Sequence, residues 1–267
     1  MHKKRVGFIG AGKMATALIS RIYNKKTSKS IIVSNRDTKD LINIKKQFKI
    51  KITKDNKAVV QNSDIVFICV KPQDIDIVIN EINNTIKNQL IVSIAAGIKL
   101  NHIESILKNK RIIRVMPNIN CMVGEMAASI SAGRHATQED INDILNVLKY
   151  AGISFLLKED LLDAVTAISG SGPAFFAYFI KAFEEAGIKN GLPKEVAFTL
   201  AAQTALGTGK LLMNKNLSVD ELIAIVASKR GTTLAGLRIL KKYNADEIIM
   251  ETINSSIKRS KELGKLP

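Results

Sequence analysis

The stretch VGFIGAGKMA, residues 6–15, is an apolar run followed at once by the pattern Gly10-x-Gly12-x-x-Ala15. In a strand–turn–helix unit, the first glycine permits the tight turn and the second lets backbone N–H groups approach a pyrophosphate. The small third residue lets the helix pack on the strand, and the helix N-terminus adds partial positive charge. Since a helical pattern follows over residues 14–23, the segment predicts a dinucleotide-binding turn rather than a glycine turn without a ligand.

Short β-rich apolar runs alternate with longer helical patterns over the first part of the chain. This alternation is typical of βαβ units and predicts a mostly parallel sheet with helices on both faces. We therefore expect an α/β fold with an N-terminal Rossmann dinucleotide-binding domain over residues 1–157. Thr137, with Asp140 three residues later, predicts a helix start between the last two runs. The runs are Val6–Ile9, Ile31–Ser34, Ile65–Val70, Leu90–Ile94, Ile112–Val115, Met126–Ile130 and Ile153–Leu157.

After Lys158 the strand-like pattern stops, and apolar residues recur at steps of three and four. Residues 158–267 are therefore predicted to form an all-helical domain. Gly191-Leu192-Pro193 should end one helix and begin the next. Four phenylalanines at helical spacing, at 175, 176, 179 and 183, favour a core or a subunit interface over a cofactor box.

The composition indicates a folded protein with an excess of positive charge. Of 267 residues, 46% are hydrophobic and 24% charged, and 40 Lys and Arg against 24 Asp and Glu give a formal charge of +16. The basic residues are dispersed among Asn and Ile, so we favour a compositional bias over a nucleic-acid partner. An anionic cofactor and substrate would still benefit from this field.

Several features predict a cytoplasmic protein without a membrane partner. The longest apolar run, Pro173–Ile180, is too short to span a bilayer. The strand expected to begin near residue 6 leaves no room for a signal peptide ahead of it. Cys69 and Cys121 form no CxxC pair, so neither a disulfide framework nor a zinc site is indicated, and a reducing compartment fits.

Residues at the end of the second predicted strand indicate which dinucleotide is bound. An NAD-binding site usually has an Asp or Glu there for the ribose hydroxyls, whereas this chain has Ser34-Asn35-Arg36. Ser and Asn can donate hydrogen bonds to a 2′-phosphate, and Arg36 supplies a delocalised charge. We expect NADPH as cofactor, with NADH possible; the alternative is that Arg36 simply begins the next helix in solvent.

Loops at the carboxyl ends of the other strands should line the same crevice, because open parallel sheets bind their ligands there. Two such loops are Val70-Lys71-Pro72-Gln73 and Ala95-Ala96-Gly97. The residues predicted to bind the cofactor are Gly10, Ala11, Gly12, Lys13, Met14, Ser34, Asn35, Arg36, Asn56, Val70, Lys71, Pro72, Ala95, Ala96 and Gly97.

Four stretches spread over the chain together resemble the pyrroline-5-carboxylate reductase family. They are GFIGAGKMATA at 7–17, RVMPN at 114–118 with VGE at 123–125, ISGSGPAF at 168–175, and SKRGTT at 228–233. The chain departs from the family at Lys13, where Asn is common, and at Lys229-Arg230, where a small pair such as Pro-Gly is usual. The second departure leaves substrate affinity less certain than cofactor binding.

The resemblance implies an oxidoreductase that makes proline. It implies reduction of 1-pyrroline-5-carboxylate to L-proline by hydride transfer from NADPH, the last step of proline biosynthesis. It also implies a C-terminal helical domain for substrate binding and dimerisation, in a homodimer that can assemble to a decamer. The chain shows no Ser/His/Asp, Cys/His or metal constellation, in agreement with a reaction that needs neither a covalent nucleophile nor a metal. His2, His102 and His135 lie outside every motif and are expected at the surface.

By the same resemblance, the substrate lies on the segment Gly231-Thr232-Thr233, with Ser171 in a loop that closes the pocket. Backbone N–H groups at a helix N-terminus can bind the substrate carboxylate, and Gly231 lets the chain approach closely. Thr233 is the expected catalytic residue, because its hydroxyl can bond the ring nitrogen while hydride arrives at the adjacent carbon. From the residues alone, helix capping would be the simpler role for these threonines.

Two alternatives remain open at this point. The first is a reductase of similar build that acts on another imine or on a β-hydroxy acid. For the latter, Lys181 is the nearest candidate proton donor, although its neighbours suggest an ordinary helix-face residue. The second is a non-catalytic protein that binds NADPH or nucleic acid through its positive charge.

Overall fold

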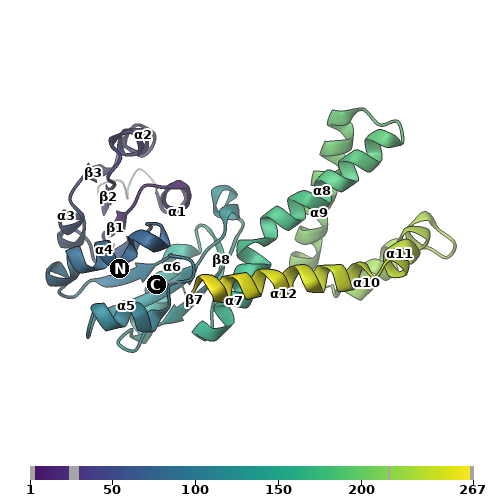
Figure 1. Ribbon diagram of the computed structural model, residues 1–267. Helices are drawn as coiled ribbons and strands as arrows, with labels where there is room; N and C mark the ends of the chain where they lie inside the picture. Colours follow the sequence, from purple (N-terminus) through teal and green to yellow (C-terminus); the bar gives the residue numbers. More distant parts are fainter. Residues whose placement is uncertain (1–3, 24–29, 216, 265–267) are drawn as a thin grey trace. The chain divides into compact units, whose positions relative to one another are not determined.

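The computed structural model describes residues 4–23, 30–215 and 217–264 (Figure 1). The chain forms two compact units, one of residues 1–171 with 256–267 and the other of residues 172–255. The first contains the sheet, and the second is built from helices. The domain boundary expected at 157/158 stays a prediction, because compactness within one chain does not define where a domain folds by itself.

The sheet unit is an eight-stranded sheet in the order β3-β2-β1-β4-β5-β6-β7-β8. Neighbouring strands are parallel except β6 and β7, which are antiparallel. The first six follow the doubly wound Rossmann order, which changes direction beside β1 and places a ligand crevice there. The strands are β1 (Val6–Ile9), β2 (Ile31–Ser34), β3 (Lys51–Thr53), β4 (Ile65–Ile68), β5 (Leu90–Ser93), β6 (Arg111–Met116), β7 (Met126–Ala132) and β8 (Gly152–Leu156).

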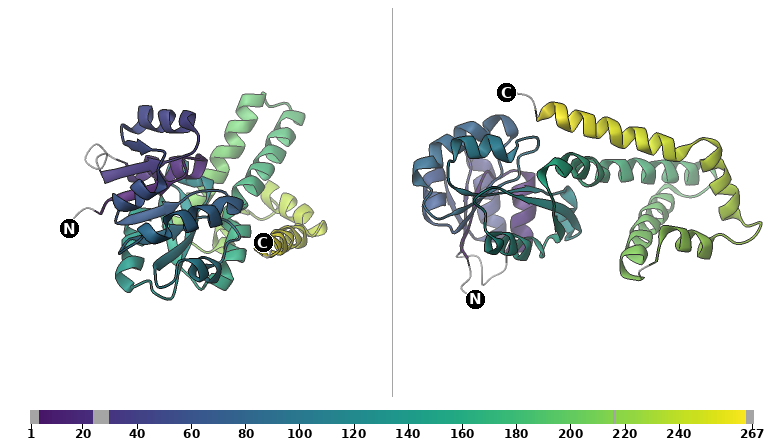
Figure 2. Two further views of the ribbon diagram at one scale, coloured as in Figure 1. Left: turned by 60° about the vertical axis from the view of Figure 1, so that its left-hand side comes forward. Right: turned by 90° about the horizontal axis from the view of Figure 1, so that it is seen from below.

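Helices cover both faces of this sheet, as the two views of Figure 2 show. One face packs against α1 (Lys13–Ile22), α2 (Thr38–Phe48) and α6 (Gln138–Leu148). The other face packs against α3 (Asn56–Gln61), α4 (Ile75–Ile82) and α5 (Leu100–Ile106). Strands buried on both sides explain the continuous apolar runs in the sequence, since they need no alternation with polar residues.

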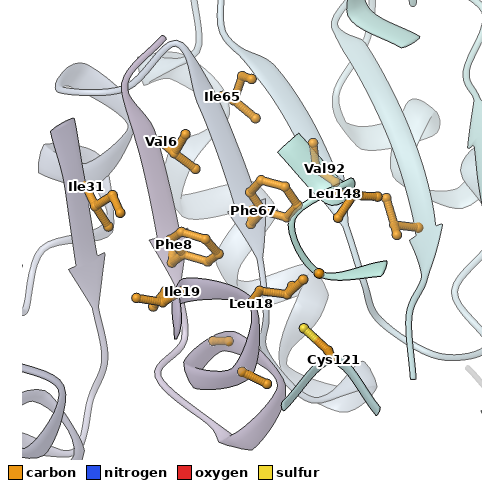
Figure 3. Packing of buried hydrophobic residues seen from close by; sticks show 14 of the residues in the cluster. Val6, Phe8, Leu18, Ile19, Ile31, Ile65, Phe67, Val92, Cys121 and Leu148 are labelled. Carbon is orange, nitrogen blue, oxygen red and sulfur yellow. The ribbon is translucent and has the colours of Figure 1, made fainter. Parts of the chain in front are cut away.

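The core on the α1 face centres on the first strand and the first helix (Figure 3). The rings of Phe8 on β1 and Phe67 on β4 stack with their centroids 5.1 Å apart. Leu18 and Ile19 of α1 are fully buried against them. Burying side chains of this size stabilises the fold by about 1.5–3 kcal/mol each, so α1 is held firmly on the sheet.

The structure confirms all seven predicted strands and the mostly parallel sheet. It adds β3, which the sequence did not indicate because its three residues are half-buried or exposed. The predicted helix start at Thr137 is confirmed as a capping box: Thr137 Oγ1 accepts from the Asp140 N–H, and Asp140 accepts from the Thr137 N–H at 2.9 Å.

The chain after Lys158 is helical, as predicted. A short helix α7 (Leu162–Val165) and a π-helical turn, η6 (Thr166–Gly170), complete the continuous part of the sheet unit. Gly191 has a φ of +91° between two long helices, and Pro193 precedes the second, as their sequence indicated. The remaining helices are α8 (Gly172–Lys189), α9 (Lys194–Lys215), α10 (Val219–Val226), α11 (Thr232–Lys242) and α12 (Ala245–Leu263), whose last residues belong to the sheet unit.

The helical unit has almost no core of its own. Among its described residues, only Gly172 and Ala197 are buried. Phe176, Phe179 and Phe183 are 65%, 43% and 69% exposed, so within one chain the phenylalanine series does not form a core. Apolar side chains exposed in such numbers on one unit favour an interface over a core within the unit, the second of the two predicted roles.

No helix in the described part of the chain is long and apolar enough to cross a membrane. His102 and His135 are exposed, as predicted, whereas His2 lies outside the described residues.

Arg230 adopts a left-handed backbone conformation just before α11, with a φ of +62°. Only glycine takes this conformation without steric cost, since a Cβ approaches the following carbonyl oxygen. This is one of the two positions where the family usually has a small residue. The departure Lys229-Arg230 therefore introduces local backbone strain at the N-terminal side of α11.

Arg230→Gly is expected to relieve this strain. The free energy of unfolding should rise by about 0.5–1 kcal/mol, the cost of a left-handed residue less the extra chain entropy of glycine. The midpoint of chemical denaturation measures the change. Arg238→Gly, in the middle of α11, is the matched control and should destabilise by about 1 kcal/mol, because glycine is unfavourable inside a helix. A loss of stability in Arg230→Gly would contradict the assignment of strain.

Candidate active site

Gly10 makes the turn that closes the first strand. Its φ is +104°, and a Cβ on it would lie 2.6 Å from the carbonyl oxygen of Cys69, so no other residue fits. The Gly10 N–H donates to the Ser34 carbonyl at 2.8 Å, and the Cys69 N–H donates to the Ile9 carbonyl at 2.7 Å. The turn therefore joins the carboxyl ends of β1, β2 and β4.

The N-terminus of α1 has the features that a phosphate group requires. Gly12 is its N-cap, with no side chain capping the helix and no acidic residue in the first turn. Nothing lies within 4 Å of the position that a Cβ on Gly12 would take. Because the first N–H groups of a helix need acceptors from outside it, this end fits the pyrophosphate of a dinucleotide.

A cavity of about 410 Å³ lies beside this turn. Eight of the predicted cofactor residues line it: Gly10, Ala11, Gly12, Asn35, Arg36, Asn56, Val70 and Lys71. Gln73, at the end of the predicted loop that begins at Val70, also lines it. The sequence did not indicate the remaining lining residues: Ile9, Asp40, Lys54, Cys69, Asp74, Ile77, Val78 and Glu81. Lys54 directly follows β3, so it could have been predicted only if that strand had been predicted. The residues of α4 could have been predicted only from the packing of that helix on the sheet.

The other predicted cofactor residues do not line this cavity. Lys13 and Met14 lie in the first turn of α1, and Ala95 and Ala96 follow β5. Pro72 and Gly97 line a neighbouring hollow of about 540 Å³. Their contact with the cofactor stays a prediction.

Ser34 acts through a neighbour in this structure. It is fully buried, and its hydroxyl donates to Asn56 Oδ1 at 2.7 Å. Asn56 Nδ2 in turn donates to Glu81 Oε2 at 2.8 Å. Ser34 therefore orients Asn56, which itself lines the cavity.

The polar groups around Arg36 are also paired with one another. Asn35 Nδ2 donates to Asp40 Oδ2 at 3.1 Å. Arg36 Nη2 lies 2.9 Å from Asp74 Oδ2, across the cavity mouth on the loop after β4. The Arg36 side chain lines the cavity and is also 82% exposed, so its contact with a cofactor stays a prediction.

Neither cysteine is a nucleophile at neutral pH. Cys69 lines the cavity, and burial raises the pKa of its thiol far above the usual value. Burial also raises the pKa of Cys121 to about 11, partly offset by the charge of Arg21. Both thiols are therefore protonated at neutral pH.

Two of the family-like stretches meet in the sheet unit. The buried Asn118 donates from Nδ2 to the Ser169 carbonyl at 3.1 Å and accepts from the Ala127 N–H at 3.2 Å. A Cβ on Gly170 would lie 2.7 Å from Met116 Cε, so the π-helical turn packs closely on the end of β6. The stretch 114–118 and the part of the stretch 168–175 that belongs to the sheet unit, residues 168–171, therefore pack together.

A buried ion pair supports the same region. Arg114 Nη1 lies 2.8 Å from Glu159 Oε1, which also accepts the Leu100 N–H at 2.7 Å. The pair thus links β6 to the N-terminus of α5. Ser171, a predicted substrate residue, lies at the end of the π-helical turn with its Oγ 3.3 Å from Ser256 Oγ.

The other predicted substrate residues begin α11 in the helical unit. Gly231 is the N-cap, and a Cβ on it would lie 2.3 Å from Ser228 Oγ and 3.1 Å from the Ser228 carbonyl oxygen, so the chain is tightly folded there. Thr232 is exposed and Thr233 half-buried, and neither hydroxyl has a hydrogen-bond partner within the described ranges. The threonines therefore do not cap the helix, and their hydroxyls are available to a ligand.

Lys181 does not have the surroundings of a proton donor. Its side chain is 68% exposed and lies 3.6 Å from Glu185, one turn further along α8. This is an ordinary helix-surface ion pair. The β-hydroxy acid alternative therefore loses its candidate residue.

Two family models match the chain. The model described as "Pyrroline-5-carboxylate reductase dimerisation" matches residues 159–263, and the model "NADP oxidoreductase coenzyme F420-dependent" matches residues 5–97. Among curated proteins, the pyrroline-5-carboxylate reductase of Methanosarcina acetivorans is 37% identical over 99% of this chain and 100% of its own length. The enzyme of the same name from Arabidopsis thaliana is 36% identical, over 98% of this chain and 96% of its own.

Solved structures give the same result. A pyrroline-5-carboxylate reductase from Coxiella burnetii superposes with a TM-score of 0.93 and 31% identity, covering 98% of this chain and 99% of its own. The Plasmodium falciparum pyrroline carboxylate reductase, solved with NADP bound, gives 0.87 and 27% identity over 99% of this chain and 100% of its own. On this full-length similarity in sequence and structure, the chain belongs to the pyrroline-5-carboxylate reductase family.

Proposed function

We propose that the protein reduces 1-pyrroline-5-carboxylate to L-proline with NADPH, the last step of proline biosynthesis. The observation that carries this proposal is the 37% identity over practically the full length of a relative with that name. A match covering both units is needed for the substrate, because the dinucleotide turn alone occurs in enzymes of many activities.

In this proposal the sheet unit binds the cofactor and the helical unit binds the substrate. NADPH, when bound, supplies the hydride. Gly10, Gly12 and the N-terminus of α1 hold the pyrophosphate, and Asn35, Arg36 and Asn56 line the end where the adenosine ribose and its phosphate lie. These groups orient the cofactor and contribute no proton.

The substrate is held by the start of α11. The N–H groups after Gly231 bind its carboxylate, and the Thr233 hydroxyl donates to the ring nitrogen. Ser171, which directly follows the π-helical turn, is the further substrate-binding residue. Positioning contributes most, because a threonine hydroxyl is too weak an acid to protonate the imine by itself.

The active form is a homodimer, which can assemble further to a decamer. Support comes from the dimerisation model that matches residues 159–263 and from the exposed apolar side chains of α8 to α12. A cytoplasmic location is supported by the free thiols of Cys69 and Cys121.

The ring size of the imine tests the substrate. NADPH oxidation, followed by the loss of its absorbance, should be faster in kcat/KM with pyrroline-5-carboxylate than with the six-membered piperideine homologue. We expect a difference of about tenfold or more, the usual effect of one methylene in a fitted pocket. Omission of the imine is the control. Preference for the larger ring would assign a different substrate to the same chemistry.

Thr233→Ala should lower kcat with pyrroline-5-carboxylate by about tenfold, the effect of losing one hydrogen bond to the reacting group. The Kd for NADPH, measured by titration of its fluorescence, should stay unchanged. Thr233→Ser keeps the hydroxyl and should restore most of the activity, and Thr199→Ala, at an exposed threonine of α9 outside the substrate segment, is the matched control. An unaltered kcat in Thr233→Ala would remove this residue from the mechanism.

Phe183→Glu should weaken the dimer, because it places a charge among exposed apolar residues of α8 that require cover. Light scattering coupled to gel filtration should show a smaller mass than for the unaltered protein at the same concentration. Ile42→Glu, at a 44% exposed site on α2, is the control and should leave the mass unchanged. Equal masses in all three proteins would exclude this face of α8 from the interface.

A further inference from the structure

Two cations flank the carboxyl end of β2. Arg36 lies two residues beyond the strand, and Lys54 directly follows β3, the neighbouring strand. The register pairs Ser34 with Thr53, so the next residues along the two strands, Asn35 and Lys54, lie beside one another. Both cations line the dinucleotide cavity, at the position where the adenosine ribose lies in folds of this order.

The two cations differ in their electrostatic state. Arg36 is partly neutralised, because Asp74 lies 2.9 Å from its guanidinium. The exposed ammonium group of Lys54 has no hydrogen bond or ion pair with any residue that the structure describes. Lys54 therefore presents its whole charge to the cavity.

Carboxylates at the same end oppose the binding of an anion. Asp40 and Glu81 line the cavity and accept from the neutral amides of Asn35 and Asn56, which leaves their negative charge uncompensated. A ribose 2′-phosphate carries about −1.5 to −2 at neutral pH. One guanidinium shared with a carboxylate offsets little of this repulsion, so the lysines that line the cavity, Lys54 and Lys71, must contribute. Of the two, Lys54 follows the strand paired with β2.

We propose that Lys54 is the residue that selects the 2′-phosphate of NADPH, and that Asp74 competes with this phosphate for Arg36. This inference rests on the proposed function and extends it to residues outside the glycine turn. When the phosphate enters, the Arg36 guanidinium exchanges the Asp74 carboxylate for phosphate oxygens, and Lys54 adds a charge-assisted hydrogen bond. A ligand without the phosphate leaves the Arg36–Asp74 ion pair intact and gains no contact with Lys54. These two effects together determine the preference for NADPH over NADH.

Calorimetric titration of the full-length protein with two fragments isolates this end of the cofactor. The probes are adenosine 2′,5′-bisphosphate, which carries the 2′-phosphate, and 5′-AMP, which lacks it. Lys54→Gln should weaken binding of the bisphosphate by about fivefold, as for one exposed charged contact, and leave 5′-AMP unchanged. Lys57→Gln, at an exposed lysine of α3 that does not line the cavity, is the matched control and should alter neither affinity.

Asp74→Asn tests the competition. Removing its charge frees Arg36 and should tighten the bisphosphate about twofold to fivefold, with 5′-AMP unaffected. The ratio of kcat/KM for NADPH to that for NADH should move in the same directions, down in Lys54→Gln and up in Asp74→Asn.

Three results would overturn the proposal: equal weakening of both probes by Lys54→Gln, no effect of that substitution on either probe, or bisphosphate binding that is unchanged or weaker in Asp74→Asn. The titrations involve no imine and no hydride transfer. Their results can therefore refute the phosphate site while the protein still reduces the imine. Conversely, a protein that binds the bisphosphate as expected but reduces no imine would contradict the proposed function and leave the phosphate site in place.

Discussion

The backbone contact between Gly10 and Cys69 is the constraint on which the dinucleotide site depends. It holds the ends of β1 and β4 too close for any side chain at position 10, while the Gly10 N–H anchors the end of β2. All these strands are parallel, so their carboxyl ends lie at one edge. The strand directions alone therefore bring the loops that follow the strands to the N-terminus of α1.

The phosphate-binding end of α1 is a second result of the same packing. Ala15, Leu18 and Ile19 are buried against the sheet, which fixes the helix axis toward the turn (Figure 3). Its first N–H groups then point to open space beside Gly12. The positive end of the helix and the glycine turn act together because both are positioned by the first strand.

The sequence predicted those parts of the fold that depend on local pattern. Seven strands, the glycine turn and the capping box at Thr137 are each encoded within a few consecutive residues. β3 was missed because Lys51-Ile52-Thr53 is too short and too exposed to show a period, and Lys54 was missed with it. Asp74 and Glu81 reach the cavity through the packing of α4 and its preceding loop, which no spacing in the sequence reports.

Side-chain pairing was also beyond the sequence. The hydrogen bond from Ser34 to Asn56 was not predicted, and the one from Asn118 to Ser169 joins stretches about fifty residues apart. The left-handed conformation of Arg230 gives a physical reason for a departure that the sequence could only note.

The near absence of buried residues in α8 to α11 has a consequence for the life of the protein in a cell. A newly made chain cannot hide these side chains until it meets another, so maturation of this part is a second-order process that slows as the chain becomes scarce. Unassembled chains remain substrates for chaperones and proteases during that wait. An inactive chain with intact helices would assemble with normal chains into mixed oligomers. The loss of total activity would then increase with the fraction of inactive chains.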